Sequence, residues 1–137
     1  MSKTSRRLAS LGAAAATFAV LDAAWISQVA LPLYKSEVPH LMAGKVDPVP
    51  AAIFYPAFTA ALTHFAVRPD EDRPLGKRLR DGALFGLAAY GTWSLTGKAV
   101  LKDFTWPTTL ADMGWGAAAG AAMAAAAHGV LKKVSKD

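Results

Sequence analysis

Two aspartates lie inside long apolar segments, and each is followed three residues later by a tryptophan. The pairs are Asp22 with Trp25 and Asp112 with Trp115. Positions i and i+3 share a helix face, so each segment presents a carboxyl group with an indole beside it. A charged side chain at the centre of a bilayer costs about 2.5–3.5 kcal/mol on insertion scales. We therefore interpret the pairs as a candidate proton-relay or cation site. The alternative is that both carboxyls only bond neighbouring helices together.

A third apolar segment supplies polar partners for these carboxyls. Tyr90, Ser94 and Lys98 are spaced by four residues and share one helix face. Lys98 could reach a carboxylate, or it could extend toward the outer membrane surface. The remaining polar residues of the apolar segments are secondary candidates: Tyr55, His64, Thr92 and Thr96.

Both aspartates are expected in the outer half of the bilayer. Asp22 precedes the outer end of its segment by nine residues, and Asp112 follows the outer start of its own segment by about five. At about 1.5 Å per residue, both carboxyls lie roughly 8–14 Å deep and could face one another. Two carboxyls that face each other in a low dielectric cannot both ionise cheaply, so one would tend to hold a proton.

The elements that must position these residues are four apolar stretches with almost no charge, at about residues 8–31, 49–67, 82–101 and 108–131. Each is long enough to cross roughly 30 Å of hydrocarbon as a helix. Pro32 is expected to end the first helix, and Pro56 to kink the second. Residues 32–48 would form either an interfacial helix or an ordinary loop. The sequence thus predicts an all-α protein, a single four-helix transmembrane domain over residues 1–137.

The distribution of basic residues predicts the topology. The net charge is +5, and most lysines and arginines lie before the first stretch, between the second and third, and after the fourth. The positive-inside rule then places both termini in the cytoplasm, as a multi-pass protein of the cell (inner or plasma) membrane. We interpret the basic surplus as a topology signal with membrane lipids as partners, and not as a nucleic-acid site.

Small residues recur at fourth positions in the last two stretches. Gly82 and Gly86 lie in one, and Gly116, Gly120 and Ala124 lie in the other. This spacing lets helix backbones approach closely, either within one chain or between chains. Because an alanine-rich helix has little bulk to fill a bundle of four, we favour a homo-oligomer.

The sequence lacks the residue patterns of metal sites, cysteine chemistry, phosphate-binding loops and serine nucleophiles. The chain has no cysteine, and its three histidines are scattered without metal-ligand spacing. No phosphate-binding loop or nucleophile elbow is present. We therefore predict no metal and no cofactor. A membrane enzyme that uses the carboxyls as acid and base on lipids is the weakest of three hypotheses; the other two are given below. The sequence therefore favours a role other than an enzyme.

Four segments in the same order resemble a bacterial family of four-span membrane proteins of unknown function. The resemblance covers roughly residues 10–125 and rests on residues 18–25, on 52–55 with 65–69, on 82–92 with 95–96, and on 112–116. The family usually has tyrosine-aspartate-leucine-threonine-asparagine in its third helix. Here Ser94 replaces the expected aspartate, and Lys98 stands where an apolar residue is usual. The resemblance implies a membrane location, a lost third carboxyl and a site that the lysine could retune.

Two functions follow from these features. The first is a small transporter or proton-relay module, which predicts a hydrated cavity open to the outer face. The alternative is an accessory or structural subunit that partners a lipid-active enzyme or a larger complex. It predicts a dry interior in which both aspartates are fully bonded. Family members that lie near genes for lipid-modifying enzymes give this alternative weak support.

Overall fold

The computed structural model describes residues 1–136, and every regular element in that range is helical. The α-helices are α1 (Lys3–Trp25), α2 (Leu31–Glu37), α3 (Val49–Leu62), α4 (Leu75–Val100) and α5 (Trp106–Val134). Two π-helical segments, η1 (Ile26–Ala30) and η3 (Thr63–Val67), continue α1 and α3, and a 3₁₀ turn, η2 (Pro39–Leu41), follows α2. The predicted all-α class is confirmed.

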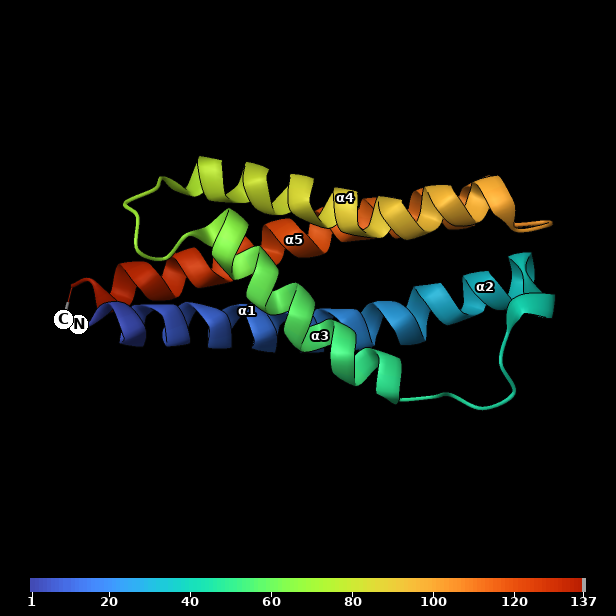
Figure 1. The fold of residues 1–137 in the computed structure, drawn as a ribbon, viewed down its shortest axis with the longest axis horizontal. Helices are drawn as coiled ribbons and strands as arrows, with labels where there is room; N and C mark the ends of the chain where they lie inside the picture. The colour runs from blue at the N-terminus through green and yellow to red at the C-terminus, as the bar shows by residue number, and fades with distance from the viewer. Residues whose placement is uncertain (137) are drawn as a thin grey trace.

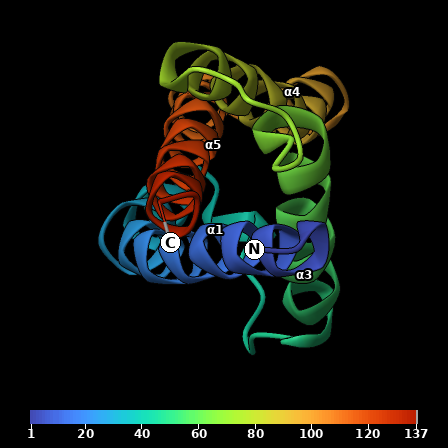
Figure 2. The same cartoon turned by 90° about the vertical axis from the view of Figure 1, so that its left-hand side faces the viewer.

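The helices form a bundle of four rods. One rod is the continuous run α1–η1–α2, which lies along the long axis with α4 and α5, whereas α3 crosses them obliquely (Figure 1). Viewed from the termini end, the rods form the four sides of a square in the order α1, α5, α4, α3 (Figure 2). Both termini and the α3–α4 connection lie at one end of the bundle, which we call the termini end. The α4–α5 connection lies at the opposite end.

Side chains define where two of the rods begin. The Ser2 hydroxyl accepts a hydrogen bond from the Ser5 N–H at 3.1 Å, and the Thr105 hydroxyl accepts one from the Thr108 N–H at 3.4 Å. Such caps satisfy N–H groups that the first helical turn leaves free. Pro107 follows in the first turn of α5, where its missing N–H costs nothing. The start of α5 places Asp112 between one and two turns inside the helix.

The prediction that Pro32 ends the first helix is wrong. The rod continues through η1 into α2 and reaches Glu37. Pro32 lies in the first turn of α2, directly after the π-helical segment, where a proline is tolerated because its absent N–H has no α-helical partner to lose. Of the residues 32–48 considered for an interfacial helix, residues 32–37 belong to this rod and residues 39–41 form the 3₁₀ turn.

The four glycines expected to pack helices lie at the contact between α4 and α5. A Cβ added to Gly86 would lie 1.8 Å from the Gly116 carbonyl oxygen, and one added to Gly120 would lie 2.0 Å from the Gly82 carbonyl oxygen. The two backbones therefore touch, as small residues at this spacing allow. The glycine seam is occupied within one chain, so it does not argue for a second copy.

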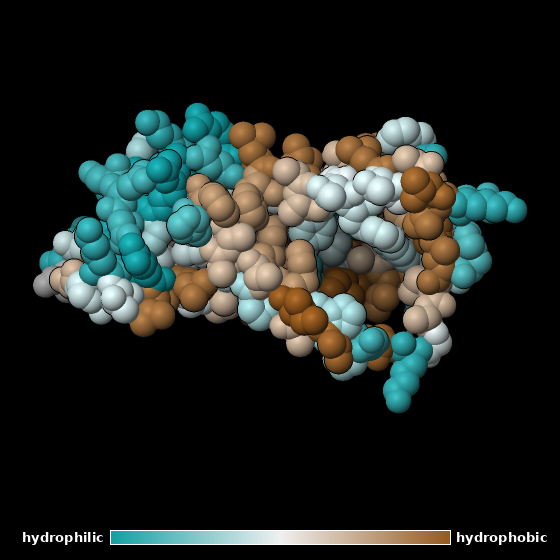
Figure 3. Space-filling view, viewed as in Figure 1, coloured by the Kyte–Doolittle hydropathy of each residue, from teal (hydrophilic) through white to brown (hydrophobic). Residues whose placement is uncertain are grey.

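Apolar side chains face outward around the middle of the bundle. Large exposed ones occur on each rod, for example Val20, Ile53, Leu84 and Leu110. Figure 3 shows hydrophobic colours across the middle and hydrophilic ones gathered at the termini end. Two helical stretches, Lys3–Glu37 and Val49–Val67, are long and apolar enough to cross a membrane. The α4 and α5 helices are longer than the second stretch but less apolar.

Candidate functional site

The two aspartate–tryptophan pairs meet across the α1–α5 contact. The indoles of Trp25 and Trp115 are stacked, with centroids 4.8 Å apart and planes inclined by 2°. The Trp115 Nε1 donates a hydrogen bond to Asp22 Oδ1 at 2.9 Å. The tryptophan of one pair thus bonds the carboxyl of the other and stacks on its indole. This crossed arrangement fixes the faces that α1 and α5 turn toward each other.

Asp22 has a second donor from a third rod. The Tyr55 hydroxyl on α3 donates a hydrogen bond to Asp22 Oδ2. Phe18, one turn before Asp22, packs against the Tyr55 ring with centroids 4.9 Å apart. The Asp22 residue is only 5% exposed. Its carboxyl therefore joins α1, α3 and α5 through one phenol and one indole.

Asp112 has its own set of partners. The Tyr34 hydroxyl on α2 donates a hydrogen bond to Asp112 Oδ2, and Trp93 Nε1 on α4 donates a long one, 3.4 Å, to the Tyr34 oxygen. The Ser94 hydroxyl is fully buried next to Asp112 without an ordinary hydrogen bond to any described residue. Asp112 itself is 8% exposed. Its carboxyl therefore links α2 to α5, and the Tyr34 hydroxyl is in turn bonded by Trp93 of α4.

One cavity brings the two carboxyls together. It has a volume of about 450 Å³, and both Asp22 and Asp112 line it. Figure 3 shows the hollow between α4 and the rod of α1 and α2, beside the oblique α3. Its walls are mostly aromatic and aliphatic, from Trp25, Ile26, Ala30, Leu31, Tyr34, Met42, Pro50, Ala51, Phe54, Tyr55, Tyr90 and Trp93. The cavity is an apolar chamber with two acidic groups in its wall.

The cavity does not continue toward the termini end. A hydrophobic cluster that includes Phe18, Phe58, Leu62 and Met123 fills the bundle interior there. The Phe18 and Phe58 rings lie 5.1 Å apart within it. The site therefore occupies the half of the bundle away from the termini.

Lys98 does not pair with either aspartate. Its Nζ lies 5.4 Å from the centroid of the Trp106 ring, near the end of the bundle opposite the termini. No ion pair among residues 1–136 includes Lys98, Asp22 or Asp112. Of the two orientations considered from the sequence, the structure does not show the one in which Lys98 reaches a carboxylate. Lys98 therefore does not neutralise either carboxyl.

The secondary candidates divide between the site and the surface. Tyr55 is a direct partner of Asp22. Thr92 is exposed and bonds the Ala88 carbonyl of its own helix, and Thr96 is also exposed. His64 is exposed too and packs edge-on against Phe65. These last three residues lie outside the cavity.

Sequence reasoning missed Tyr34 and the role of Trp93. Tyr34 follows Pro32, where the sequence predicts a helix end, so it falls in the expected outer loop. Trp93 is not among the residues that the sequence pattern singles out. If the first helix is continued past Pro32, Tyr34 lies on the same rod as Asp22. Its phenol is then a candidate hydrogen-bond donor for a membrane carboxyl.

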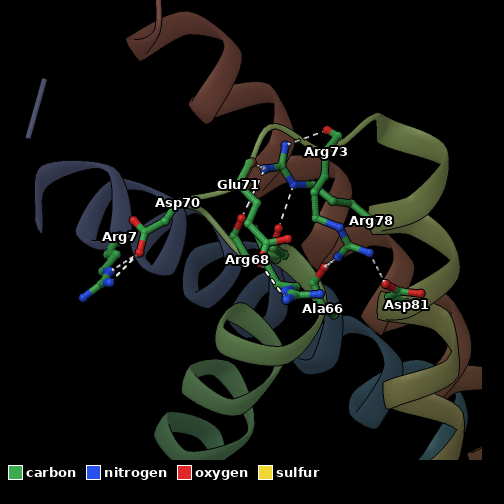
Figure 4. Close-up of polar contacts among 9 residues, drawn as sticks. Arg7, Ala66, Arg68, Asp70, Glu71, Arg73, Arg78 and Asp81 are labelled. Carbon is green, nitrogen blue, oxygen red and sulfur yellow. Dashed lines mark hydrogen bonds and ion pairs between the residues drawn. The ribbon is translucent and has the colours of Figure 1, made fainter. Parts of the chain in front are cut away.

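A second polar cluster closes the termini end of the bundle (Figure 4). The Arg78 guanidinium, in a residue 3% exposed, donates to the carbonyl oxygens of Val67, Arg73 and Glu71 at 2.7, 3.2 and 2.9 Å. Val67 ends η3, so Arg78 caps that helix with a positive charge. It thereby fixes the connection between α3 and α4.

Ion pairs surround this cap. Asp81 pairs with Arg73, whose guanidinium lowers the pKa of that carboxyl. Asp70 pairs with Arg7 of α1, and this hydrogen bond likewise lowers the Asp70 pKa. The pairs attach the start of α1 and the start of α4 to the α3–α4 connection.

The sequence of the chain matches one family. The model of a family described as "Predicted membrane protein (DUF2177)" matches residues 8–129. The chain belongs to the DUF2177 family. The match covers all four rods and both aspartate–tryptophan pairs, so the resemblance and the helical membrane bundle are confirmed. No curated protein and no solved structure matches the chain.

The DUF2177 description names a membrane protein but no reaction. The geometry adds that no group of three or more histidine, cysteine, aspartate or glutamate residues within residues 1–136 could hold a metal ion. What the DUF2177 bundle does hold is a pair of buried carboxyls in a chamber with aromatic walls. Each carboxyl accepts hydrogen bonds from neutral groups, and carboxyls in general can also exchange protons and attract cations.

Proposed function

We propose that this DUF2177 protein is a small transporter or proton-relay module of the cell membrane, and that the cavity of Asp22 and Asp112 is its site. The observation that carries the proposal is the pairing of two buried carboxyls with neutral donors only. A buried carboxylate without a cation is costly, so each group must hold a proton or attract a positive charge. A cavity that lets either species reach the carboxyls supports exchange.

The proposed topology puts the cavity in the outer half of the membrane. Basic residues gather at the termini end, where Lys3, Arg6, Arg7 and the α3–α4 connection lie together. The positive-inside rule favours the cytoplasm for this end. The hydrophobic cluster then separates the cavity from the cytoplasm, and transport requires that this cluster rearranges. A C-terminal fluorescent reporter should be active inside the cell, and a C-terminal periplasmic alkaline phosphatase should be inactive. The opposite result would overturn the topology.

Proton flux into liposomes tests the proposed function. The purified chain is reconstituted with an internal pH-sensitive dye, and a potassium gradient with valinomycin supplies the driving force. We expect faster acidification than in protein-free liposomes, and a loss of this excess in Asp22→Asn and Asp112→Asn. Asp103→Asn is the matched control, because Asp103 is an exposed loop carboxyl with φ of 62°, which asparagine tolerates. Wild-type flux equal to that of empty liposomes contradicts the proton-relay function.

One observation favours the accessory-subunit alternative. Both oxygens of Asp22 accept hydrogen bonds, from Trp115 and from Tyr55, and together they join three rods. Such bonds hold a bundle together whether or not anything crosses it. Under this alternative, Asp22→Asn lowers thermal stability while flux is absent in the wild type. A lipid-active enzyme should then co-purify with the tagged chain after crosslinking in membranes.

A further inference from the structure

We propose that the cavity binds an ammonium group, either of a small soluble amine or quaternary ammonium compound or of a lipid headgroup. This inference rests on the proposed function, because it names the occupant of the same cavity. The shared chemistry is a single positive charge spread over a nitrogen with attached carbon atoms. The two sources are distinguished by experiment below.

The first argument is the charge balance of the cavity. Asp22 and Asp112 line it, and their bonded partners are two phenols and one indole. All ion pairs found in residues 1–136 involve arginines at the termini end. The protein therefore supplies hydrogen bonds to the carboxyls but no positive charge. A bound cation would supply it.

The second argument is the nature of the walls. Trp25, Phe54, Tyr55, Tyr90 and Trp93 all line the cavity. Aromatic faces attract cations, and cages of such rings are used to recognise quaternary ammonium groups. A hard metal ion needs several oxygen ligands close together. Such a ligand set is missing from the described part of the chain, which has no cluster of three metal-ligating residues. Aromatic walls with two acids suit an organic cation.

The third argument is the available room. The volume of about 450 Å³ lies within the range of small-molecule sites.

The cavity opens where an ammonium group from either source could enter it. Ile26, Leu31 and Ala51 in the wall are also exposed at the surface of the bundle. The hollow opens at the side of the bundle, between α4 and the first rod (Figure 3). A lipid headgroup can approach from the membrane, and a soluble amine from the outer end.

Calorimetric titration with choline tests the inference directly. The full chain is placed in nanodiscs of phosphatidylglycerol alone, so that no lipid carries an ammonium group. Choline should bind, and its neutral isostere, in which carbon replaces the ammonium nitrogen, should bind at least about tenfold more weakly, because only the charge differs. Equal binding of both compounds, or no binding of choline, overturns the proposal.

Isosteric variants show whether the carboxyls bind the cation. Asp22→Asn and Asp112→Asn should each weaken choline binding at least about tenfold, and Asp103→Asn should leave it unchanged. Circular dichroism and size-exclusion chromatography check that each variant is folded. Since the isostere comparison uses the wild-type chain, it decides the question even if one variant does not fold. Unchanged binding in both folded cavity variants overturns the proposal.

Lipid composition distinguishes the two sources. If a headgroup is the natural occupant, phosphatidylethanolamine or phosphatidylcholine in the nanodiscs should compete with choline and weaken its apparent affinity. If a soluble amine is the occupant, the affinity should stay constant. Both results support an ammonium site. Proton flux is measured separately, so choline binding without flux refutes transport alone, and flux without choline binding refutes the ammonium site alone.

Discussion

Replacing Gly86 by alanine should separate α4 from α5. The added Cβ would lie 1.8 Å from the Gly116 carbonyl oxygen, which belongs to the backbone and cannot rotate away. Ordinary van der Waals contact begins near 3.4 Å, so the helices must move apart by about 1.6 Å at this crossing. Tyr90 and Asp112 lie about one turn from the contact on their respective helices, so the cavity should widen as well.

The expected cost can be set against the intrinsic gain of alanine. Overpacking costs about 1–3 kcal/mol in ordinary cores, and a backbone-to-backbone clash belongs at the upper end. Alanine recovers about 1 kcal/mol over glycine in a helix interior. We therefore expect Gly86→Ala to lower the free energy of unfolding by about 2 kcal/mol. Gly114→Ala in α5 is the matched control, because no heavy atom lies within 4 Å of its added Cβ.

The assay is an unfolding titration in mixed dodecyl maltoside and sodium dodecyl sulfate micelles, followed by circular dichroism. Gly114→Ala should be neutral or stabilised by up to about 1 kcal/mol. If Gly86→Ala is as stable as Gly114→Ala, the close contact of α4 and α5 does not exist. The positions that this contact gives to Tyr90 and Asp112 would then be wrong as well.

Three other perturbations have definite expected results. Arg78→Met should lower the free energy of unfolding by about 3 kcal/mol in the same titration, because several buried carbonyl oxygens lose their charged donor. Trp115→Phe should keep an aromatic stack but abolish exciton-coupled circular dichroism between indoles, and should cost about 1.5–3 kcal/mol through the lost bond to Asp22. Asp70, whose pKa is lowered by Arg7, should stabilise the attachment of α1 above the ordinary carboxyl pKa and lose this effect as pH falls through its own lowered pKa. The hydrogen-exchange protection factors in residues 68–74, which are corrected for the pH dependence of intrinsic exchange, should therefore fall in acid, and this fall should be absent in Asp70→Asn.

Each of these three predictions has a matched control variant. Arg80→Met removes an arginine whose side chain is 62% exposed and should change stability little. Trp106→Phe should leave the exciton signal intact, because Trp106 lies outside the stacked pair. Asp72→Asn should keep the acid-dependent fall in protection. A control that behaves like its partner variant would show that the assigned contact is not the cause.

Residue periodicity and charge distribution were enough to predict the fold, because few backbone structures can span a bilayer. A chain with four long stretches almost free of charge must satisfy its backbone internally, and helices do this within each segment. The spacing of Gly82 and Gly86 against Gly116 and Gly120 also indicated a close helix contact. It could not show that the contact lies within one chain, because that depends on which rods are neighbours.

The site was predictable only in part. The faces of Asp22 and Asp112 followed from helical spacing, but their donors come from other rods. Lys98 has a long flexible stem, so sequence spacing left its direction open, and the structure shows it beside Trp106. Tyr34 was missed because the proline rule was applied to a position where a π-helical segment changes the hydrogen-bond pattern.

The η1 segment sets the rotational phase of the first rod. Asp22 and Tyr34 are twelve residues apart, which in a regular α-helix would place them about 120° apart around the axis. A π-helical turn holds one additional residue and so reduces the angle between the two residues around the axis by about 100°. The tyrosine is thereby turned to within about 20° of the aspartate's side, and both reach one chamber. Local helix type and chain length are thus matched in this rod. If Ile26–Ala30 became regular α-helix at its full length, the phenol would turn to about 120° from the aspartate and leave the chamber. Deleting one of these five residues would remove the π-turn as well, and a regular α-helix with the two positions eleven residues apart would again place them about 20° apart around the axis.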